Sequence, residues 1–205
     1  MVSKAEGRTR RLADVDAGEQ ARALAADHRK DPRLVQAVLD ETASLLRAER
    51  GILICETRHG LVCANAGVDQ SNAKEGEVVL LPEDPDGSAR MLRARLANLR
   101  GVRPAVVVTD SFGRPWRLGQ TDVAIGAAGI VALDDWRGRH DARGRELHAT
   151  AAAVADALAG AADLARAKDS EEPAVHVRGL ERFVTADDGP GAAALRRPRD
   201  QHLFL

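Results

Sequence analysis

Short apolar segments alternate with longer segments of helical periodicity along the chain, and this alternation limits the fold more than any other feature. Several of the strand-like runs are bounded by turn residues and are hairpin-like. We therefore predict a mixed α/β (α+β) fold, with a mixed sheet and flanking helices, rather than a pure doubly wound sheet. Helices are predicted at 17–28, 32–48, 84–101 and 143–167, and strands at 51–56, 61–65, 77–82, 104–110, 121–133 and 174–179.

Three details refine this prediction. Asp31 followed by Pro32 is a helix-start signal. The continuous apolar run at 104–110 is typical of a strand buried on both faces. The final stretch is rich in Gly, Pro, Arg and Ala, so we expect one folded domain over residues 1–184 and a tail or linker over 185–205.

The overall composition excludes several classes of protein. The net charge is −1, aromatic residues make up only 2%, and tyrosine is absent, so the features of a nucleic-acid-binding surface are missing. The longest apolar run, 124–133, is too short to cross a membrane, and the first residues lack the apolar core of a secretory signal. Cys55 and Cys63 lack metal-site spacing and are expected to be buried free thiols. We expect a cytoplasmic protein that binds neither nucleic acid nor membrane.

Two aspartates follow apolar strand-like segments and are the leading candidates for a metal site. Asp69 lies in HGLVCANAGVDQSN (59–72), and Asp110 ends the segment AVVVTD. Mg²⁺ and Mn²⁺ prefer oxygen ligands, and Mg²⁺ is typically held by one or two carboxylates together with substrate phosphates. Ser111 adds a hydroxyl ligand, and Asn72 adds a donor for a phosphate or a base. The alternative interpretation is that each aspartate only forms a turn.

A pair of arginines follows Asp110 closely. Arg114 and Arg117 flank Pro-Trp in the segment GRPWR, and guanidinium groups bind carboxylate or phosphate at two points. Such a pair would stabilise charge that develops on a transferred phosphoryl group. The alternative is a surface loop of ion pairs. The charged segments 84–90 and 134–146 are interpreted as a helix start and as a solvated turn leading into a helix.

Five long segments carry the most specific signal in the chain. They are VSKAEGR (2–8), RHGLVCANAGVDQSN (58–72), VLLPEDPDGSARMLR (79–93), VVVTDSFGRPWRLGQTDVAIGAAGI (106–130) and RGRHDARGREL (137–147). Taken together and in this order, they resemble the coenzyme F420-0:L-glutamate ligase (gamma-glutamyl ligase) family. The resemblance extends over about residues 2–180.

The resemblance implies a GTP-dependent ligase. GTP would phosphorylate the lactyl carboxylate of coenzyme F420-0, or of its dehydro form, and L-glutamate would displace phosphate from the acyl phosphate to form an amide. Further glutamates would follow through γ-linkages. The family matches make Lys4 and Asn72 contacts of GTP, Asp69 and Asp110 ligands of one divalent cation (Mg²⁺ or Mn²⁺), and Ser111 a ligand of a second. They also imply an intertwined homodimer and, in some members, a potassium ion.

Two departures from the family pattern leave an alternative open. Family members have a further segment before VSKAEGR that helps to hold the nucleotide, so the chain is expected to be truncated at its N-terminus relative to the family. The family's later nucleotide- and metal-contacting segment corresponds to 166–172, where Lys168 occupies roughly the place of the second-metal ligand. The alternative is a truncated, non-catalytic module that binds the deazaflavin or dimerises, and that needs a partner chain to bind GTP.

Overall fold

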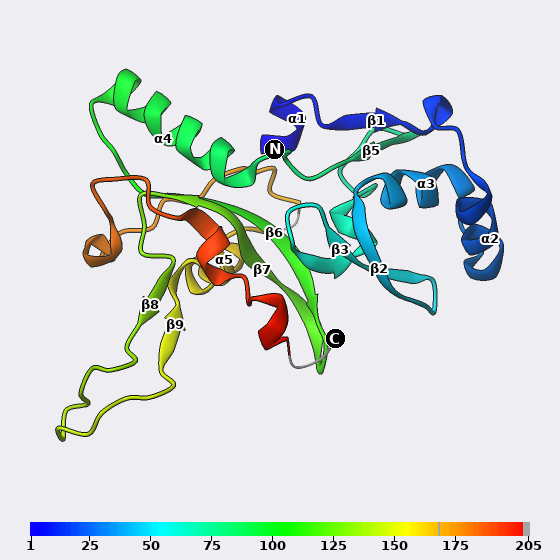
Figure 1. Cartoon of the computed structure of the whole chain (residues 1–205). Helices are drawn as coiled ribbons and strands as arrows, with labels where there is room; N and C mark the ends of the chain where they lie inside the picture. Colours follow the sequence, from blue (N-terminus) through cyan, green and yellow to red (C-terminus); the bar gives the residue numbers. More distant parts are fainter. Residues whose placement is uncertain (168, 203–205) are drawn as a thin grey trace. The chain divides into compact units, whose positions relative to one another are not determined.

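The computed structural model describes residues 1–167 and 169–202 (Figure 1). The chain divides into two units, the first made of residues 1–84 and 112–119 and the second of residues 85–111 and 120 onward. In the described residues the strands form four small sheets that accompany the helices, which confirms the mixed α/β class. No described helix is long and apolar enough to cross a lipid bilayer.

The first sheet of the first unit joins the beginning of the chain to a distant strand. β1 (Thr9–Arg11) pairs antiparallel with β5 (Glu77–Val79), within the strand predicted at 77–82. The short helix α1 (Val2–Ala5) precedes β1. The sequence does not predict β1, because three residues of a charged segment show no alternation of apolar and polar residues.

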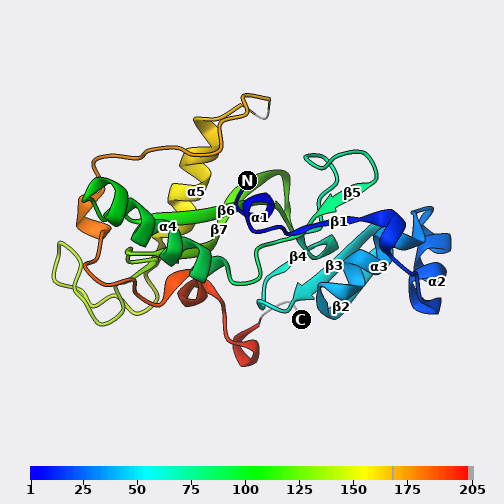
Figure 2. The same ribbon diagram turned by 90° about the horizontal axis from the view of Figure 1, so that it is seen from above.

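Two helices, α2 (Glu19–His28) and α3 (Pro32–Asp40), pack against each other, and α3 also lies beside β2 (Figure 2). Asp31 caps α3, because its side chain accepts a hydrogen bond from Arg33 N at 2.8 Å. This confirms the helix start that the Asp-Pro pair predicts.

The helix predicted over 32–48 is wrong in its second half, which forms a strand. β2 (Thr42–Glu49) pairs antiparallel with β3 (Ile52–Thr57), and β3 pairs with β4 (Val62–Ala64) as the predicted hairpin requires. The adjacent leucines at 45–46 fit a helix or a strand when read alone. Pairing with β3 favours the strand, because a neighbouring strand provides hydrogen-bond partners for the backbone N–H and C=O groups and packs against the side chains.

The core of the first unit combines side chains of α2, α3, β3 and β5. Cys55 and Cys63 are free and buried, as predicted, and burial raises the pKa of the Cys55 thiol. The buried members of this core are Leu12, Ala21, Ala25, Val35, Ala37, Val38, Leu53, Cys55, Ala66, Val68, Val78 and Leu80.

In the second unit, α4 (Pro85–Arg100) begins and ends close to the predicted limits. β6 (Val106–Arg114) and β7 (Arg117–Ala128) form a two-stranded sheet, whose turn region, 112–119, groups with the first unit. The prediction that the first of these strands is buried on both faces is wrong. Within β6 only Val108 is buried, because a two-stranded sheet has no strand neighbour beyond its single partner.

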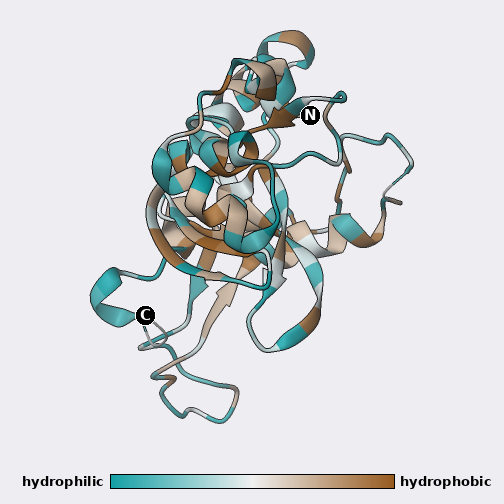
Figure 3. Ribbon diagram, turned by 90° about the vertical axis from the view of Figure 1, so that its right-hand side faces the viewer, coloured by the Kyte–Doolittle hydropathy of each residue, from teal (hydrophilic) through white to brown (hydrophobic). Residues whose placement is uncertain are grey.

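The helix predicted over 143–167 starts later than expected. α5 (Val154–Leu164) follows a hairpin of β8 (Leu133–Asp135) and β9 (Ala151–Ala153). The alanines of β9 favour a helix when read alone, but they pair with β8 instead. The loop at 136–150, at the bottom of Figure 3, is exposed and largely hydrophilic. It is a solvated segment, as predicted, but it leads into a strand rather than a helix.

The segment after α5 contains 3₁₀ turns and irregular backbone. The strand predicted at 174–179 is wrong, because the structure has no strand at these residues. The 3₁₀ turns of the described residues are η1 (Leu12–Asp14), η2 (Asn65–Gly67), η3 (Glu181–Phe183), η4 (Gly191–Leu195) and η5 (Arg199–Gln201). The core of this unit consists of the buried residues Ala124, Ala127, Ile130, Ala132, Val154, Ala155 and Ala192.

Two buried charges of α4 hold the segment that follows residue 184. The Arg93 guanidinium is 1% exposed and donates to Asp187 O at 2.9 Å and to Asp188 Oδ1 at 2.6 Å. Asp86 Oδ1 accepts from the backbone of Ala127 at 2.8 Å and of Ala192 at 2.7 Å. These bonds satisfy buried backbone groups that would otherwise be costly. The domain limit at residue 184 stays a prediction.

Candidate functional site

A turn at residues 69–72, named here the acidic turn, carries two of the predicted site residues. The backbone of Asp69 exchanges two hydrogen bonds with Val79, at 2.9 and 2.8 Å, and this fixes the start of the turn. The Asp69 carboxylate accepts from Ser71 N at 2.8 Å, from Ser71 Oγ at 2.7 Å and from Asn72 Nδ2 at 3.3 Å. Its orientation is therefore set by neighbours within three residues of the sequence.

The Asp69 carboxyl group is half-buried, and its pKa lies below the ordinary value of 3.8. Burial by itself would raise this pKa, but the hydrogen bonds from Ser71 and Asn72 favour the charged form and outweigh the burial. Asp69 is therefore ionised at neutral pH, as a carboxylate ligand of a divalent cation must be.

A left-handed turn upstream positions the acidic turn. Asn65, Ala66 and Gly67 have φ angles of 51°, 52° and 72°. Non-glycine residues in this conformation are uncommon and cluster at ligand sites. A Cβ at Gly67 would lie 2.6 Å from Leu81 Cγ, so a side chain here would force its neighbour to move. Asn65 Oδ1 accepts from Leu53 N at 3.3 Å, which ties the turn to β3.

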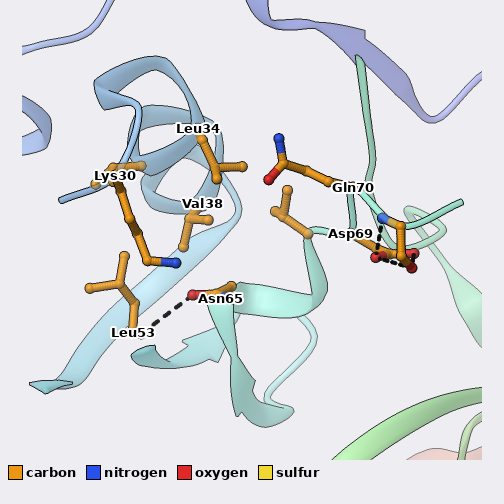
Figure 4. Close-up of a pocket in the computed structure, with 10 residues that line it drawn as sticks. Lys30, Leu34, Val38, Leu53, Asn65, Asp69 and Gln70 are labelled. Atoms are coloured by element: carbon orange, nitrogen blue, oxygen red, sulfur yellow. Dashed lines mark hydrogen bonds between the residues drawn. The ribbon is translucent and has the colours of Figure 1, made fainter. Parts of the chain in front are cut away.

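Two cavities of the first unit meet the acidic turn. The first cavity, of about 200 Å³, includes Asp69 and Ser71 in its wall together with Lys30, Leu34, Val38, Leu53, Asn65 and Gln70 (Figure 4). The second cavity, of about 370 Å³, includes Asn72 together with Lys4, Thr9, Ala73, Lys74 and Glu77. The acidic turn therefore contributes consecutive residues to both cavities.

The two residues predicted to contact GTP lie together in the second cavity. Lys4 Nζ donates a hydrogen bond to Asn72 O, although the two residues are far apart in the sequence. Lys74 lines the same cavity and brings a second ammonium group. Two ammonium groups against the single carboxylate of Glu77 leave the lining of this cavity with a net positive charge, which favours a phosphate.

In the second unit, a buried carboxylate holds one of the predicted metal ligands. The Asp122 side chain on β7 is 3% exposed and accepts from Ser111 Oγ at 2.6 Å, Thr109 Oγ1 at 2.8 Å and Arg166 Nη2 at 2.6 Å. We name these four residues the Asp122 cluster. Asp122 is absent from the predicted site, although a charge within the apolar segment TDVAIGAAGI was a usable signal. Such a charge requires buried partners.

The other predicted metal ligand of the second unit is adjacent to this cluster. Asp110 directly precedes Ser111 on β6 and is half-buried. Asp69 belongs to the first unit and Asp110 to the second, so the sharing of one cation by the two carboxylates stays a prediction.

Arg114 and Arg117 lie on the exposed turn region of the β6–β7 hairpin. Neither side chain lines the two cavities described above. Their catalytic role therefore stays a prediction.

The segment 166–172, assigned from the family pattern, begins at a residue of the Asp122 cluster. Its first residue, Arg166, binds the Asp122 carboxylate, and the contact of this segment with a nucleotide or metal stays a prediction. Lys168, the predicted counterpart of a second-metal ligand, lies outside the described residues.

The oxygen donors of Asp69 in the first unit, and of Asp110 and Ser111 in the second, are each of the kind that a divalent cation prefers. The described residues contain no group of three or more His, Cys, Asp or Glu side chains that would enclose a metal by themselves. Mg²⁺ typically uses one or two carboxylates and completes its coordination with water and phosphate oxygens. The ionised Asp69 carboxylate and the oxygens of Asp110 and Ser111 are donors of this kind.

Comparison with known proteins places the chain in a family. The model of the F420-0:Gamma-glutamyl ligase family matches residues 1–179. The coenzyme F420:L-glutamate ligase of Methanopyrus kandleri is 47% identical over 206 residues, which cover 100% of this chain and 82% of the relative. The enzyme of the same name from Methanothermobacter thermautotrophicus is 42% identical over 100% of this chain and 81% of its own length, and that from Haloarcula marismortui is 45% identical over 88% and 73%. The chain belongs to the F420-0:gamma-glutamyl ligase family.

Proposed function

We propose that the protein is a GTP-dependent ligase that forms an amide between L-glutamate and the carboxylate of coenzyme F420-0 or its dehydro form, and then adds γ-linked glutamates. Relatives named as coenzyme F420:L-glutamate ligases support the reaction class. One observation of the structure carries the proposal. The acidic turn carries the ionised Asp69, which lines the first cavity, and its last residue, Asn72, lines a second cavity together with two lysines.

In the first step, an oxygen of the coenzyme carboxylate attacks the γ-phosphorus of GTP. The bond from this phosphorus to the bridging oxygen breaks, and GDP leaves with the electron pair. Lys4 and Asn72 are the proposed GTP contacts, and Lys74 adds positive charge to the same cavity. Asp69 is the proposed ligand of Mg²⁺ or Mn²⁺, which when bound neutralises phosphate charge.

In the second step, the amine of L-glutamate attacks the acyl carbon of the acyl phosphate. The carbon–nitrogen bond forms, the bond from carbon to the phosphate oxygen breaks, phosphate leaves with the electron pair, and the nitrogen loses a proton. The chain contributes mainly by holding the two reactants in position, which is a large part of the rate in phosphoryl-transfer enzymes.

Further parts of the proposal concern the second unit and the assembly. Asp110 and Ser111 are the proposed cation ligands on β6, with Ser111 assigned to a second cation. Arg114 and Arg117 are proposed to stabilise charge on the transferred phosphoryl group. We also propose that the protein binds a potassium ion and forms a homodimer. Light scattering tests the homodimer, which should have twice the 21.9 kDa mass of the chain.

A ligation assay tests the proposed function. Purified protein is incubated with GTP, Mn²⁺, L-glutamate and coenzyme F420-0, and the glutamylated product and GDP are measured by mass spectrometry and chromatography. We expect one GDP for each amide formed. ATP in place of GTP serves as the nucleotide control. Absence of product, together with absence of Mn²⁺-dependent GTP binding in calorimetry, would contradict the proposal and favour the non-catalytic module.

A further inference from the structure

The first cavity is lined by a half-buried lysine, Lys30, that forms no ion pair in the described part of the chain. The carboxylate of Asp31, its neighbour in the sequence, is already occupied, because it binds Arg33 N at 2.8 Å and Arg33 Nη2 at 2.7 Å. A partly desolvated ammonium group without a counter-ion favours binding of an anion.

The walls of the cavity suit a small ligand with charged ends and an aliphatic middle. Leu34, Val38 and Leu53 provide apolar surface between the polar groups. Figure 4 shows Lys30 and Asp69 on opposite sides of the cavity, with the Asp69 carboxylate bonded to Ser71 of the acidic turn. The Gln70 amide lies on the wall as a further polar group. A cavity of about 200 Å³ has room for a free amino acid and is far too small for a deazaflavin.

We infer that the first cavity is the binding site of the incoming L-glutamate, with one of its carboxylates on Lys30 and its amine directed toward the acidic turn. This inference rests on the proposed function, because it names the place of one substrate of that reaction. The orientation is chemically useful. Lys30 holds an end of the amino acid that does not react, and the nucleophilic nitrogen faces the acidic turn, beyond which the proposed GTP contacts line the second cavity.

The same geometry predicts a preference among amino acids. L-Glutamine has nearly the shape of L-glutamate but carries a neutral amide in place of the side-chain carboxylate. If Lys30 binds this carboxylate, the protein discriminates against glutamine, because the ammonium group would be left without its charged partner.

The first test is kinetic and uses the variant Lys30→Gln. We expect the KM for L-glutamate to rise about 10- to 100-fold, in line with the loss of a hydrogen bond between charged groups, while the KM for GTP stays within about 2-fold. The preference for L-glutamate over L-glutamine should shrink by a similar factor. Lys30→Arg keeps the charge and should recover part of the affinity. Arg22→Gln, which removes an exposed cation of α2, is the matched control and should leave all constants unchanged.

The second test does not depend on turnover. The chain has lysines only at 4, 30, 74 and 168, so acylation of each ammonium group can be followed by mass spectrometry. We expect L-glutamate to suppress acylation of Lys30 but not of Lys74, and GTP with Mn²⁺ to suppress acylation of Lys4 and Lys74 but not of Lys30.

The outcomes separate this inference from the proposed function. If the wild type ligates glutamate normally but Lys30→Gln leaves its KM unchanged and L-glutamate does not protect Lys30, the inference is overturned and the ligase stands. If no ligation occurs but L-glutamate still protects Lys30, the site stands and the proposed reaction fails. Protection of Lys30 by coenzyme F420-0 in place of L-glutamate would assign the cavity to the other carboxylate substrate and overturn the inference.

Discussion

Asp69 in the first unit and Asp122 in the second are both held by hydroxyl groups, but their surroundings differ. The carboxylate of Asp69 is half-buried, and the groups that donate hydrogen bonds to it, on Ser71 and Asn72, are its neighbours in the sequence. The carboxylate of Asp122 is buried, and its partners Ser111 and Arg166 lie 11 and 44 residues away. Asp69 is thus oriented by a local turn beside a cavity, whereas Asp122 is enclosed by the fold.

The comparison assigns different roles to two chemically identical side chains. Asp69 borders the first cavity and is ionised, so it is suited to contact a ligand. Asp122 accepts three hydrogen bonds from protein groups, including a guanidinium. It is therefore suited to position Ser111, in the way that groups behind metal ligands commonly do.

Asp69→Asn should reduce the ligation rate by about 10²- to 10³-fold, because it removes the charge of a proposed metal ligand. The fold should change little, since the amide retains most of the local hydrogen bonds. Ligation rates and circular dichroism measure the two effects. Asp141→Asn is the matched control, because Asp141 forms the same kind of turn, accepting from Arg143 N at 2.7 Å, in an exposed loop. Equal losses for both variants would remove the special role of Asp69.

Asp122→Ala should lower the free energy of unfolding by about 3 kcal/mol, because it leaves the Arg166 guanidinium and two hydroxyl groups without their acceptor. Urea unfolding measures this change. Asp135→Ala removes an equally short ion pair, with Arg137, but on the exposed surface, and should have little effect. A small loss at Asp122 would contradict its role as a buried anchor.

Asp122→Asn keeps the volume of the side chain and tests positioning more directly. We expect weaker binding of Mn²⁺ in the presence of GDP, by about 10-fold, because the oxygen of Ser111 is less well oriented. Spectroscopic titration of Mn²⁺ measures this change without turnover. In a protein that already carries Ser111→Ala, Asp122→Asn should not weaken Mn²⁺ binding further, because Asp122 acts on the cation through Ser111. Full additivity of the two substitutions would rule out this coupling.

The smallest expected effect is a change of stability with pH. The pKa of Asp69 is lowered from 3.8 in the folded protein, so its contribution to stability is present above the unfolded value and is lost as the pH falls through the folded pKa. Asp69→Asn should therefore lose less stability than the wild type between about pH 5 and pH 3. Urea midpoints at the two pH values measure the difference. If the wild type and Asp69→Asn lose the same stability between these two pH values, the local hydrogen bonds do not stabilise the charged form of Asp69.

Much of the fold was predictable where the signals are local. The start of α3 follows from Asp31 and Pro32, and the β3–β4 hairpin follows from two apolar runs and a turn. β2 and β9 were missed because their sequences also suit helices, and only pairing with a neighbouring strand decides their conformation. The sequence does not predict β1, because its three residues show no alternation of apolar and polar side chains and its partner, β5, lies far along the chain.

The same division applies to the candidate site, and it has one physical cause. Motifs and turns depend on neighbouring residues, so the family, the acidic turn and the candidates Asp69, Asn72 and Lys4 can be predicted from the sequence. The contact of Lys4 with Asn72, the place of Lys30 in a cavity wall and the enclosure of Asp122 by distant partners are seen only in the folded chain. These contacts arise only when segments far apart in the chain pack together and remove side chains from water, and residue spacing alone does not encode that packing.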